Sequence, residues 1–305
     1  MLARLQQFTT LGGLLLAALW GVVWWRLGHE AWALAGVAVI VIGYAGVLAL
    51  EFAFLRMAHG DDVTPKASTW QLLRAWWGEV RSAPLVFCWR QPFFSQRYPN
   101  RLQGSRDQRG VLLIHGFVCN RGLWNHWLQR LHQHDVPLIA LNLEPVFGGI
   151  DEYASAIEQA ITQLQQATGQ APVVVAHSMG GLALRAWWAQ SKGDHRVHHA
   201  ITLGTPHHGT WLARFALTRN SQQMRRASRW LQALAAEEPA ERARQFTCFY
   251  SHCDNIVFPP KTATLAGADN RHLPGVAHVH MVEHPEPWNE LLRLINLPGS
   301  QPGSH

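Results

Sequence analysis

Cysteine is scarce in this 305-residue chain: four are present, and no two of them form a C-x-x-C pair. This spacing excludes a small disulfide-stapled scaffold, so we interpret the cysteines mainly as structural thiols. Charge is sparse as well, since Lys, Arg, Asp and Glu make up 15% of the residues and hydrophobic residues 48%. Such a composition is typical of a globular chain with room for one large domain and an extra segment.

Basic blocks and metal-binding motifs are also missing. The net charge is only +6, and Lys and Arg do not form blocks interleaved with aromatic residues, which excludes a typical nucleic-acid surface. The 18 histidines include no H-E-x-x-H motif, and the HRVHH cluster at 195–199 has no acidic residue at ligand spacing. We interpret this cluster as a solvated basic loop that leads into a strand, and we expect no metal site.

The longest apolar runs lie in the first 56 residues. Phe8–Trp25 and Ala31–Leu50 contain no charged residue, and the short break Arg26–Glu30 separates them. A helix of 18 residues spans about 27 Å, close to the hydrocarbon thickness of a bilayer. With several Trp residues near the break, these runs predict a transmembrane helical hairpin over residues 1–56. A buried pair of core helices is the alternative, whereas a cleaved signal peptide fits poorly because the second run would remain.

Basic residues flanking the hairpin predict its orientation. Arg4 precedes it and Arg56, Lys66 and Arg74 follow it, whereas the turn carries only Arg26. Under the positive-inside rule both ends, and therefore the large domain, lie in the cytoplasm.

Residues 57–107 form a connector between the hairpin and the large domain. Within it, TWQLLRAWWGEVR at 69–81 predicts an amphipathic helix with several aromatic residues. Such a helix lies either along the bilayer surface or against the next domain, and the sequence leaves both possibilities open.

Residues 108–296 alternate between strand-like and helix-like segments, which predicts an α/β fold with a mostly parallel, doubly wound sheet. Residues 151–169 predict a helix that begins at an Asp cap and ends at a Gly, and 285–295 a closing helix with Pro near its start. The tail at 297–305 is expected to be disordered. The predicted strands cover 111–117, 136–143, 171–176, 198–206, 244–254 and a short 271–278.

Ser178 lies in the stretch APVVVAHSMGG, between a buried strand and a helix. Ala176 and Gly180 are small, as a tight turn requires where strand and helix approach each other closely. Such a turn exposes the hydroxyl at the carboxyl edge of the sheet, beside a helix N-terminus that favours developing negative charge. The stretch therefore predicts a nucleophilic serine, and an ordinary turn with a polar helix cap is the alternative interpretation.

A serine nucleophile needs a base, and the base needs an orienting carboxylate; in this fold the chain order is Ser, acid, His. Asp254 and His278 each follow a predicted strand downstream of the serine, so both are expected at the same sheet edge. Asp269, His280 and His284 are rivals for these two roles. Asp254 is favoured because a hydrophobic strand delivers it, and His278 because a bend precedes it and an apolar run follows.

The expected oxyanion donors are two backbone N–H groups. Met179 follows the nucleophile, and Phe117 follows the His-Gly turn after the first core strand. Gly116 lets the chain turn close to a substrate carbonyl, and His115 and His177 are assigned supporting roles beside these turns.

The motifs IHGF, AHSMGG, LGTPHHGT, YSHCDNIVFPP and GVAHVHM occur in this order and together resemble bacterial lipases and esterases of the α/β-hydrolase superfamily. The resemblance covers roughly residues 108–295, and it implies Ser178 as nucleophile, Asp254 as acid and His278 as base, with no metal or organic cofactor. The added hairpin departs from the secreted members, and Ala176 replaces the Gly that usually opens the serine turn.

In the family that the chain resembles, the segment corresponding to 211–243 contributes to a cap or lid over the acyl pocket. The alternative is an ordinary surface helix in which Met224, Trp230, Leu231 and Leu234 pack on the core.

The sequence thus predicts a membrane-anchored serine hydrolase of the bacterial inner membrane that cleaves carboxylic esters, with lipid-like acyl esters favoured, through an acyl-enzyme. Its expected partners are a lipid or ester substrate and the bilayer, without nucleic acid. An acyltransferase or thioesterase with the same triad is one alternative. A non-catalytic binding module on a hydrolase fold is another, although an intact Ser, Asp and His favours an enzyme.

Overall fold

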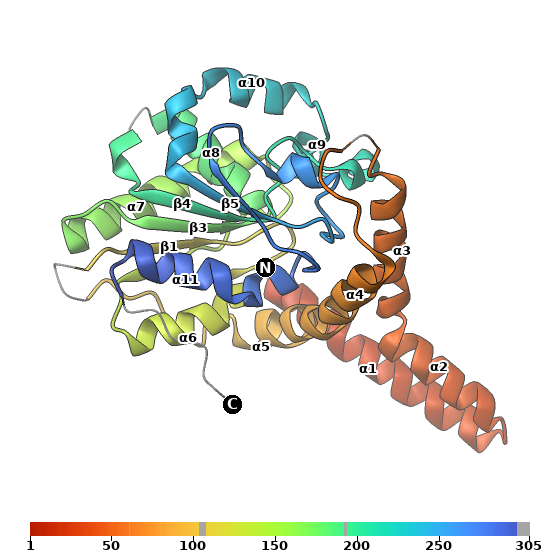
Figure 1. Cartoon of the computed structure of the whole chain (residues 1–305). Helices are drawn as coiled ribbons and strands as arrows, with labels where there is room; N and C mark the ends of the chain where they lie inside the picture. The colour runs from red at the N-terminus through yellow and green to blue at the C-terminus, as the bar shows by residue number, and fades with distance from the viewer. Residues whose placement is uncertain (61, 104–107, 192–193, 298–305) are drawn as a thin grey trace, which may run out of the picture.

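A six-stranded sheet forms the centre of the molecule, and all its neighbouring strands are parallel (Figure 1). The computed structural model describes residues 1–60, 62–103, 108–191 and 194–297; part of the predicted tail lies outside them. The strand order is β2-β1-β3-β4-β5-β6, which confirms the predicted parallel α/β sheet. The bounds are β1 Val111–Ile114, β2 Leu138–Ala140, β3 Val173–His177, β4 His199–Leu203, β5 Phe246–Tyr250 and β6 Asp269–His272.

The last strand is shorter than predicted and begins earlier. β6 ends at His272, because Pro274 has no N–H to donate to a neighbouring strand and Gly275 has a left-handed backbone with φ of +73°. The prediction of a strand over 271–278 is therefore wrong in its second half, and His278 is reached through a turn.

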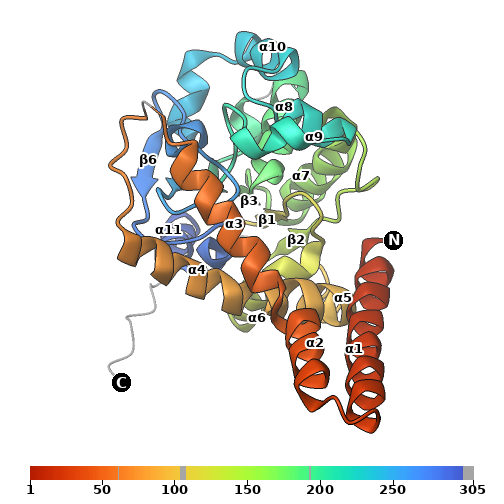
Figure 2. The same ribbon diagram turned by 90° about the vertical axis from the view of Figure 1, so that its right-hand side faces the viewer.

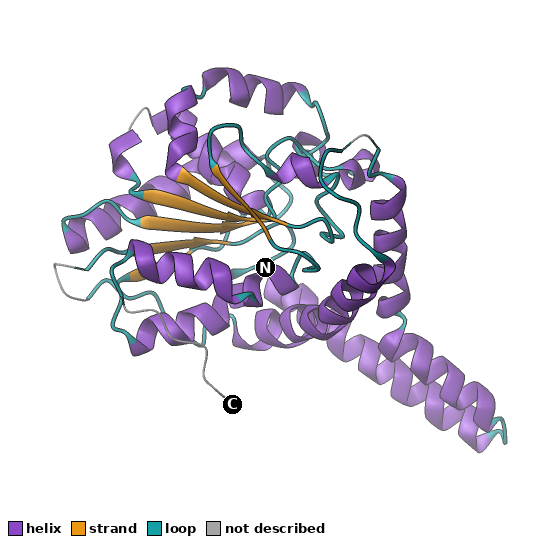
Figure 3. Ribbon diagram, viewed as in Figure 1, coloured by secondary structure: helices purple, strands orange, loops and turns teal. Residues whose placement is uncertain are grey.

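Helices cover both faces of the sheet (Figures 1 and 3), so it is doubly wound as predicted. Alternate strand residues point to opposite faces: Leu112 and Val174 pack in the core under α7 and α8, whereas Leu113 and Val175 pack in the core under α6 and α11. Burial on both faces explains why the strands are continuous apolar runs. The helix bounds are α6 Asn125–Gln133, α7 Ala154–Thr168, α8 Met179–Ser191 and α11 Pro285–Leu294.

The first two helices, α1 (Leu2–Arg26) and α2 (Glu30–Ile42), project from the α/β domain (Figure 2). They lie side by side, as predicted for a hairpin. The second predicted span is not one straight helix, because the chain bends by 53° between α2 and α3 (Tyr44–Met57). By length and composition α1 could cross a membrane, and the bent pair α2–α3 could be a second span.

The bend directs α3 along the α/β domain. The Tyr44 hydroxyl donates a 2.8 Å hydrogen bond to the Val80 carbonyl, and the Trp76 indole donates one of 2.9 Å to the Ala45 carbonyl. Further along α3, Phe52 is buried against the domain, so the second half of this helix cannot be wholly lipid-exposed.

The connector contains the predicted amphipathic helix as α4 (Thr69–Pro84), and a capping box between Ser68 and Gln71 fixes its start. Its buried face packs on the α/β domain, although Trp70 on the other face is exposed. The helical path continues without a break through the π-helical segment η1 (Leu85–Arg90) into α5 (Gln91–Phe94).

The segment 211–243 folds into short helical pieces rather than one helix. Met224 follows α9, so it does not share a helix with Leu231 and Leu234, although all three are buried. The pieces pack on α8 and its surroundings (Figure 1). Their bounds are η5 Trp211–Phe215, α9 Arg219–Gln223, α10 Arg229–Glu237 and η6 Ala240–Gln245.

We predict that Gly180→Ala destabilises the protein. A Cβ at Gly180 would lie 2.6 Å from the His115 carbonyl oxygen and 2.7 Å from that of Ile114. These backbone atoms at the end of β1 cannot move without distorting the sheet. The expected cost is about 1–3 kcal/mol of unfolding free energy, measured as a lower Tm in detergent. Gly46→Ala on α3 is the control: its Cβ would meet no atom within 4 Å, so its Tm should be unchanged or higher. Equal Tm values for Gly180→Ala and wild type would contradict the close approach.

Candidate active site

The direction in which the chain adds strands to the sheet reverses between β1 and β3, whose carboxyl ends lie side by side. From β1 the chain moves outward to β2, then returns to place β3 on the other side of β1. In open α/β sheets, ligands bind in the crevice outside the strand ends at such a switch. Phe117 follows β1 and Ser178 follows β3, so both predicted site residues lie at this crevice.

Ser178 has a left-handed backbone with φ of +54°. Its N–H donates to the Leu203 carbonyl at 2.8 Å, and its own carbonyl accepts a 2.9 Å hydrogen bond from the Thr205 hydroxyl. A non-glycine residue in this region is strained and persists only where its surroundings hold it, which happens most often at active sites. A capping serine has an extended backbone instead, so the geometry argues against an ordinary helix cap.

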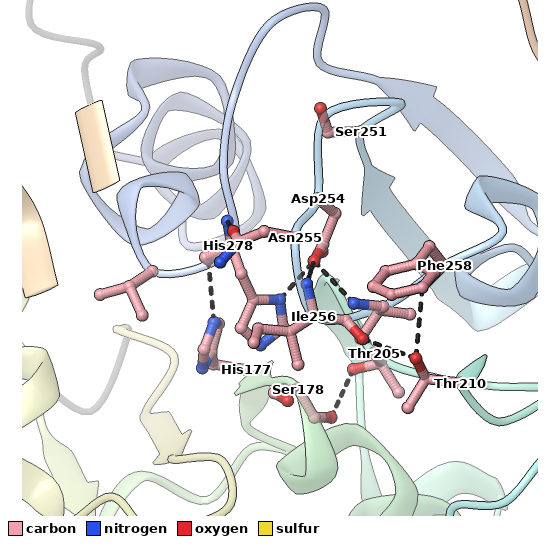
Figure 4. A network of polar contacts seen from close by, with 12 residues as sticks. His177, Ser178, Thr205, Thr210, Ser251, Asp254, Asn255, Ile256, Phe258 and His278 are labelled. Carbon is pink, nitrogen blue, oxygen red and sulfur yellow. Dashed lines mark hydrogen bonds and ion pairs between the residues drawn. The ribbon is translucent and has the colours of Figure 1, made fainter. Parts of the chain in front are cut away.

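Asp254 and His278 form a buried pair. The Nδ1 atom of His278 lies 2.9 Å from Oδ2 of Asp254, and the other carboxylate oxygen accepts hydrogen bonds from the N–H groups of Ile256 and Val257. In Figure 4 the His278 ring lies between the Asp254 carboxylate and Ser178. The structure thus brings the three predicted residues together in the order that a nucleophile, a base and an orienting acid require.

Gly204, which the sequence analysis missed, leaves room for this pair. A Cβ there would lie 2.8 Å from Oδ2 of Asp254 and 3.0 Å from Nδ1 of His278, and its φ of +54° also favours glycine. The LGTP motif at the end of β4 was the available signal.

The rival residues have other contacts. Asp269 pairs with Arg271 at 2.6 Å and is half exposed. His284 accepts a hydrogen bond from the Glu286 N–H at the start of α11, and His280 lies in the turn η8. None of the three rivals is among the described residues that line the cavity beside Ser178.

The environment of His278 favours its protonated form. Burial alone would lower the pKa of His278, but the Asp254 carboxylate opposes this through its charge and its hydrogen bond. The charges of Glu79 and Glu51 act in the same direction, and the net result is a raised pKa. The neutral imidazole, the form that could act as a base, therefore predominates only at a higher pH than for an ordinary histidine.

Glu79 of α4 is a second residue that the sequence analysis missed. Its buried carboxylate accepts hydrogen bonds from the N–H groups of Val279 and His280, at 3.0–3.2 Å and 3.0 Å, directly after His278. Burial raises the pKa of Glu79 to about 7, although these hydrogen bonds lower it. The helix around Glu79 was predicted, but the fold alone determines that this carboxylate faces the loop of His278.

Glu51 of α3 reaches the same loop through Asn255. Its carboxylate accepts a 2.6 Å hydrogen bond from the Asn255 side-chain amide, and the Asn255 side-chain oxygen accepts one of 3.1 Å from the His278 N–H. A single acidic residue after a long apolar run was the only sequence signal.

The loop that contains Phe117 is tightly packed. A Cβ at Gly116 would lie 2.8 Å from Cβ of Ser178, so only glycine fits there. Val118 has a φ of +53°, which is unusual for a β-branched residue and marks a strained turn. Phe117 lines the same cavity as Ser178, and Met179 begins α8 directly after the serine. These positions suit the two expected oxyanion donors.

The two supporting histidines are neutral structural groups. Burial lowers the pKa of His115 to about 4, and its ring contacts the Gly116 carbonyl and accepts a hydrogen bond from the Leu143 N–H. Burial, with the neighbouring His278, also lowers the pKa of His177, whose Nε2 lies 3.2 Å from the His278 carbonyl oxygen.

A cavity of about 1180 Å³ extends from Ser178 and His278. Its other walls come from α1, α2, α3, α4, η1 and α5, whereas none of the described residues that line it belongs to 211–243. The N-terminal helices, rather than the segment between β4 and β5, therefore cover the site.

Metal-ligand clusters are absent from the part of the chain that the structure describes. His199 of the HRVHH cluster lies in β4 and contacts the Thr247 hydroxyl at 2.9 Å. The four cysteines are free thiols, three of them buried.

Comparisons with known proteins agree with this fold. A sequence profile of the Alpha/beta hydrolase family matches residues 111–254. The mature form of Bacillus licheniformis lipase BlEst2 is similar with a TM-score of 0.56 and 15% identity, over 65% of this chain and 96% of that one. Aspergillus fumigatus lipase B is similar with a TM-score of 0.51 and 19% identity, over 64% of this chain and 54% of that one. At these identities the likeness shows the fold. A search of curated proteins gives no significant match.

We predict that Glu79→Gln lowers the pKa of His278. The substitution keeps a hydrogen-bond acceptor near Val279 and His280 but removes a negative charge that stabilises the imidazolium. NMR titration of ¹⁵N-labelled histidine should show the shift. Glu237→Gln, on the exposed side of α10, is the charge-matched control and should leave this pKa unchanged. An unaltered His278 titration in Glu79→Gln would contradict the electrostatic role.

Proposed function

We propose that this protein is a serine carboxylic-ester hydrolase that acts on lipid-like acyl esters. The match of residues 111–254 to the profile of the Alpha/beta hydrolase family supports this proposal. The observation that carries the proposal is the buried Asp254–His278 pair beside the strained Ser178, at one end of a large cavity. A hydroxyl, an imidazole and a carboxylate in this order can activate the hydroxyl as a nucleophile.

The reaction proceeds through an acyl-enzyme. The Ser178 hydroxyl attacks the ester carbonyl carbon while Nε2 of His278 takes its proton. The resulting oxyanion accepts hydrogen bonds from the N–H groups of Phe117 and Met179; one such donor is typically worth about 3 kcal/mol. As the tetrahedral intermediate collapses, the alcohol leaves with the proton from His278. Water then attacks the acyl-enzyme with His278 again as base, which releases the carboxylic acid and restores the serine.

Asp254 keeps His278 in the required tautomer. Its carboxylate accepts the Nδ1 proton, so Nε2 is left free to accept the serine proton. Two backbone N–H groups hold the carboxylate in place, and its burial keeps water from competing for the imidazole. No metal or organic cofactor takes part in this mechanism.

The enzyme is anchored in a membrane, in our proposal the bacterial inner membrane, with two spans and a cytoplasmic catalytic domain. Large apolar side chains along α1 and α2, such as Leu15 and Val39, are more than half exposed, as side chains that face lipid would be. Residues 1–56 form the hairpin, 57–107 the connector and 108–296 the catalytic domain.

Ser178→Ala should abolish turnover while the protein remains folded, because the change removes only a hydroxyl. Ester hydrolysis should fall by a factor on the order of 10⁴ or more, and Asp254→Asn should lose about 10⁴ through the wrong histidine tautomer. A fluorophosphonate probe should label a peptide within residues 171–185 of wild type but not of Ser178→Ala. Asp269→Asn is the control and should retain activity. Full activity in Ser178→Ala, or no labelling of folded wild type, would refute the proposed mechanism.

The pH profile should reflect the raised pKa of His278. Since the neutral imidazole is the base, kcat/KM should be low in acid and rise with pH through a midpoint above the ordinary value of 6.5. Initial rates on a short-chain ester between about pH 5 and 9 would measure it. A midpoint at or below 6.5 would show that the surrounding carboxylates do not act on His278 as described.

A further inference from the structure

The cavity beside Ser178 reaches the outer surface of the membrane hairpin. Leu11 and Leu14 of α1, Val41 of α2 and Val47 of α3 line the cavity. The same four side chains are 45–59% exposed on the isolated protein. They therefore belong both to the wall of the cavity and to the apolar surface that a bilayer would cover, so the cavity opens toward the bilayer.

The attachment of α1 explains where this opening lies. Near its start, Gln6 donates a 2.7 Å hydrogen bond to Gln91 of α5, and Gln7 donates one to the Pro92 carbonyl. Near its end, the Trp20 indole donates a hydrogen bond to the Trp32 carbonyl of α2. The cavity-lining part of α1, Thr9–Leu14, lies between these attachments.

Three polar side chains along the cavity have hydrogen-bond partners within the protein. The Tyr44 hydroxyl donates to the Val80 carbonyl, the Glu51 carboxylate accepts from Asn255, and the Glu79 carboxylate accepts from the N–H of Val279. Apart from the catalytic end, the wall therefore presents mainly hydrocarbon. Such a wall favours an alkyl chain over a polar headgroup.

We propose that the N-terminal helices bind the substrate as well as anchor the enzyme: the acyl chain of a bilayer-resident lipid ester passes laterally between α1 and α2–α3 to reach Ser178. This inference rests on the proposed esterase function. The cavity of about 1180 Å³ exceeds the roughly 300–1,000 Å³ that suits drug-sized ligands, so it has room for a long chain. The acyl chain moves from the hydrocarbon of the bilayer to the hydrocarbon wall of the cavity. Only the ester group leaves the bilayer for the polar end of the cavity beside Ser178.

The test uses the full-length protein in nanodiscs. Variants with larger side chains narrow the cavity at its hairpin end. Val47→Trp on α3 and Leu14→Trp on α1 add bulk to the cavity lining from two different helices. Val39→Trp on α2 is the matched control, because Val39 is 71% exposed and does not line the cavity. For each variant kcat/KM is measured for a palmitoyl ester dissolved in the nanodisc and for p-nitrophenyl acetate in water.

We expect the palmitoyl-to-acetyl ratio of kcat/KM to fall by about tenfold or more in Val47→Trp and Leu14→Trp, equivalent to about 1.4 kcal/mol. The ratio should stay near that of wild type in Val39→Trp. An unchanged ratio in both cavity variants, or an equal fall in Val39→Trp, would overturn lateral access while leaving the esterase intact. Wild type that hydrolyses neither ester would instead refute the esterase function on which this inference rests.

Discussion

The left-handed backbone of Ser178 constrains everything packed around it. The strain of such a turn, of order 1–3 kcal/mol, must be outweighed by contacts that exist only when the ends of β1, β3 and β4 converge. Glycines at 116, 180 and 204 allow that convergence. A Cβ at any of them would come within 3.0 Å of Ser178, of the backbone at the end of β1, or of the Asp254–His278 pair. The same crowding that holds Ser178 in place leaves little space around the Asp254–His278 pair.

Electrostatics adds a second constraint, since three carboxylates surround one buried imidazole. Asp254 contacts the ring directly, whereas Glu79 and Glu51 act from the side of the N-terminal segment and also bind the loop that carries His278. In a buried site such charges are screened weakly. They stabilise the protonated imidazole, so His278 stays protonated up to a higher pH than an ordinary histidine. In the proposed mechanism the same charges would stabilise the imidazolium that forms when the serine gives up its proton. The N-terminal segment is therefore part of the electrostatic environment of His278.

Local sequence patterns were sufficient to predict the parallel sheet, the helices α4, α7 and α11, and the serine turn, because each depends on periodicity, helix-end signals or glycine within one segment. Asp254 and His278 were predicted from the chain order and from the strands that precede them, and the structure brings the two within hydrogen-bond distance. Glu79 could not be predicted, because its role depends on contacts with residues about 200 positions away. The bend after Ile42 was missed for a similar reason: an apolar run shows its length but not the surface against which its second half packs.

Because of the bend between α2 and α3, one face of α3 passes from the cavity to the packed interior of the protein within about three turns. Val47, Glu51 and Leu55 are spaced four residues apart, so they share one face of the helix. Val47 lines the cavity, Glu51 binds Asn255 beside the triad, and Leu55 is buried in the cluster that contains Phe258. A straight span would continue along the line of α2, away from the catalytic loop, and would leave the Glu51 carboxylate without its amide partner. Since one helix contacts both the cavity and the loop of His278, a displacement of α3 would alter both together.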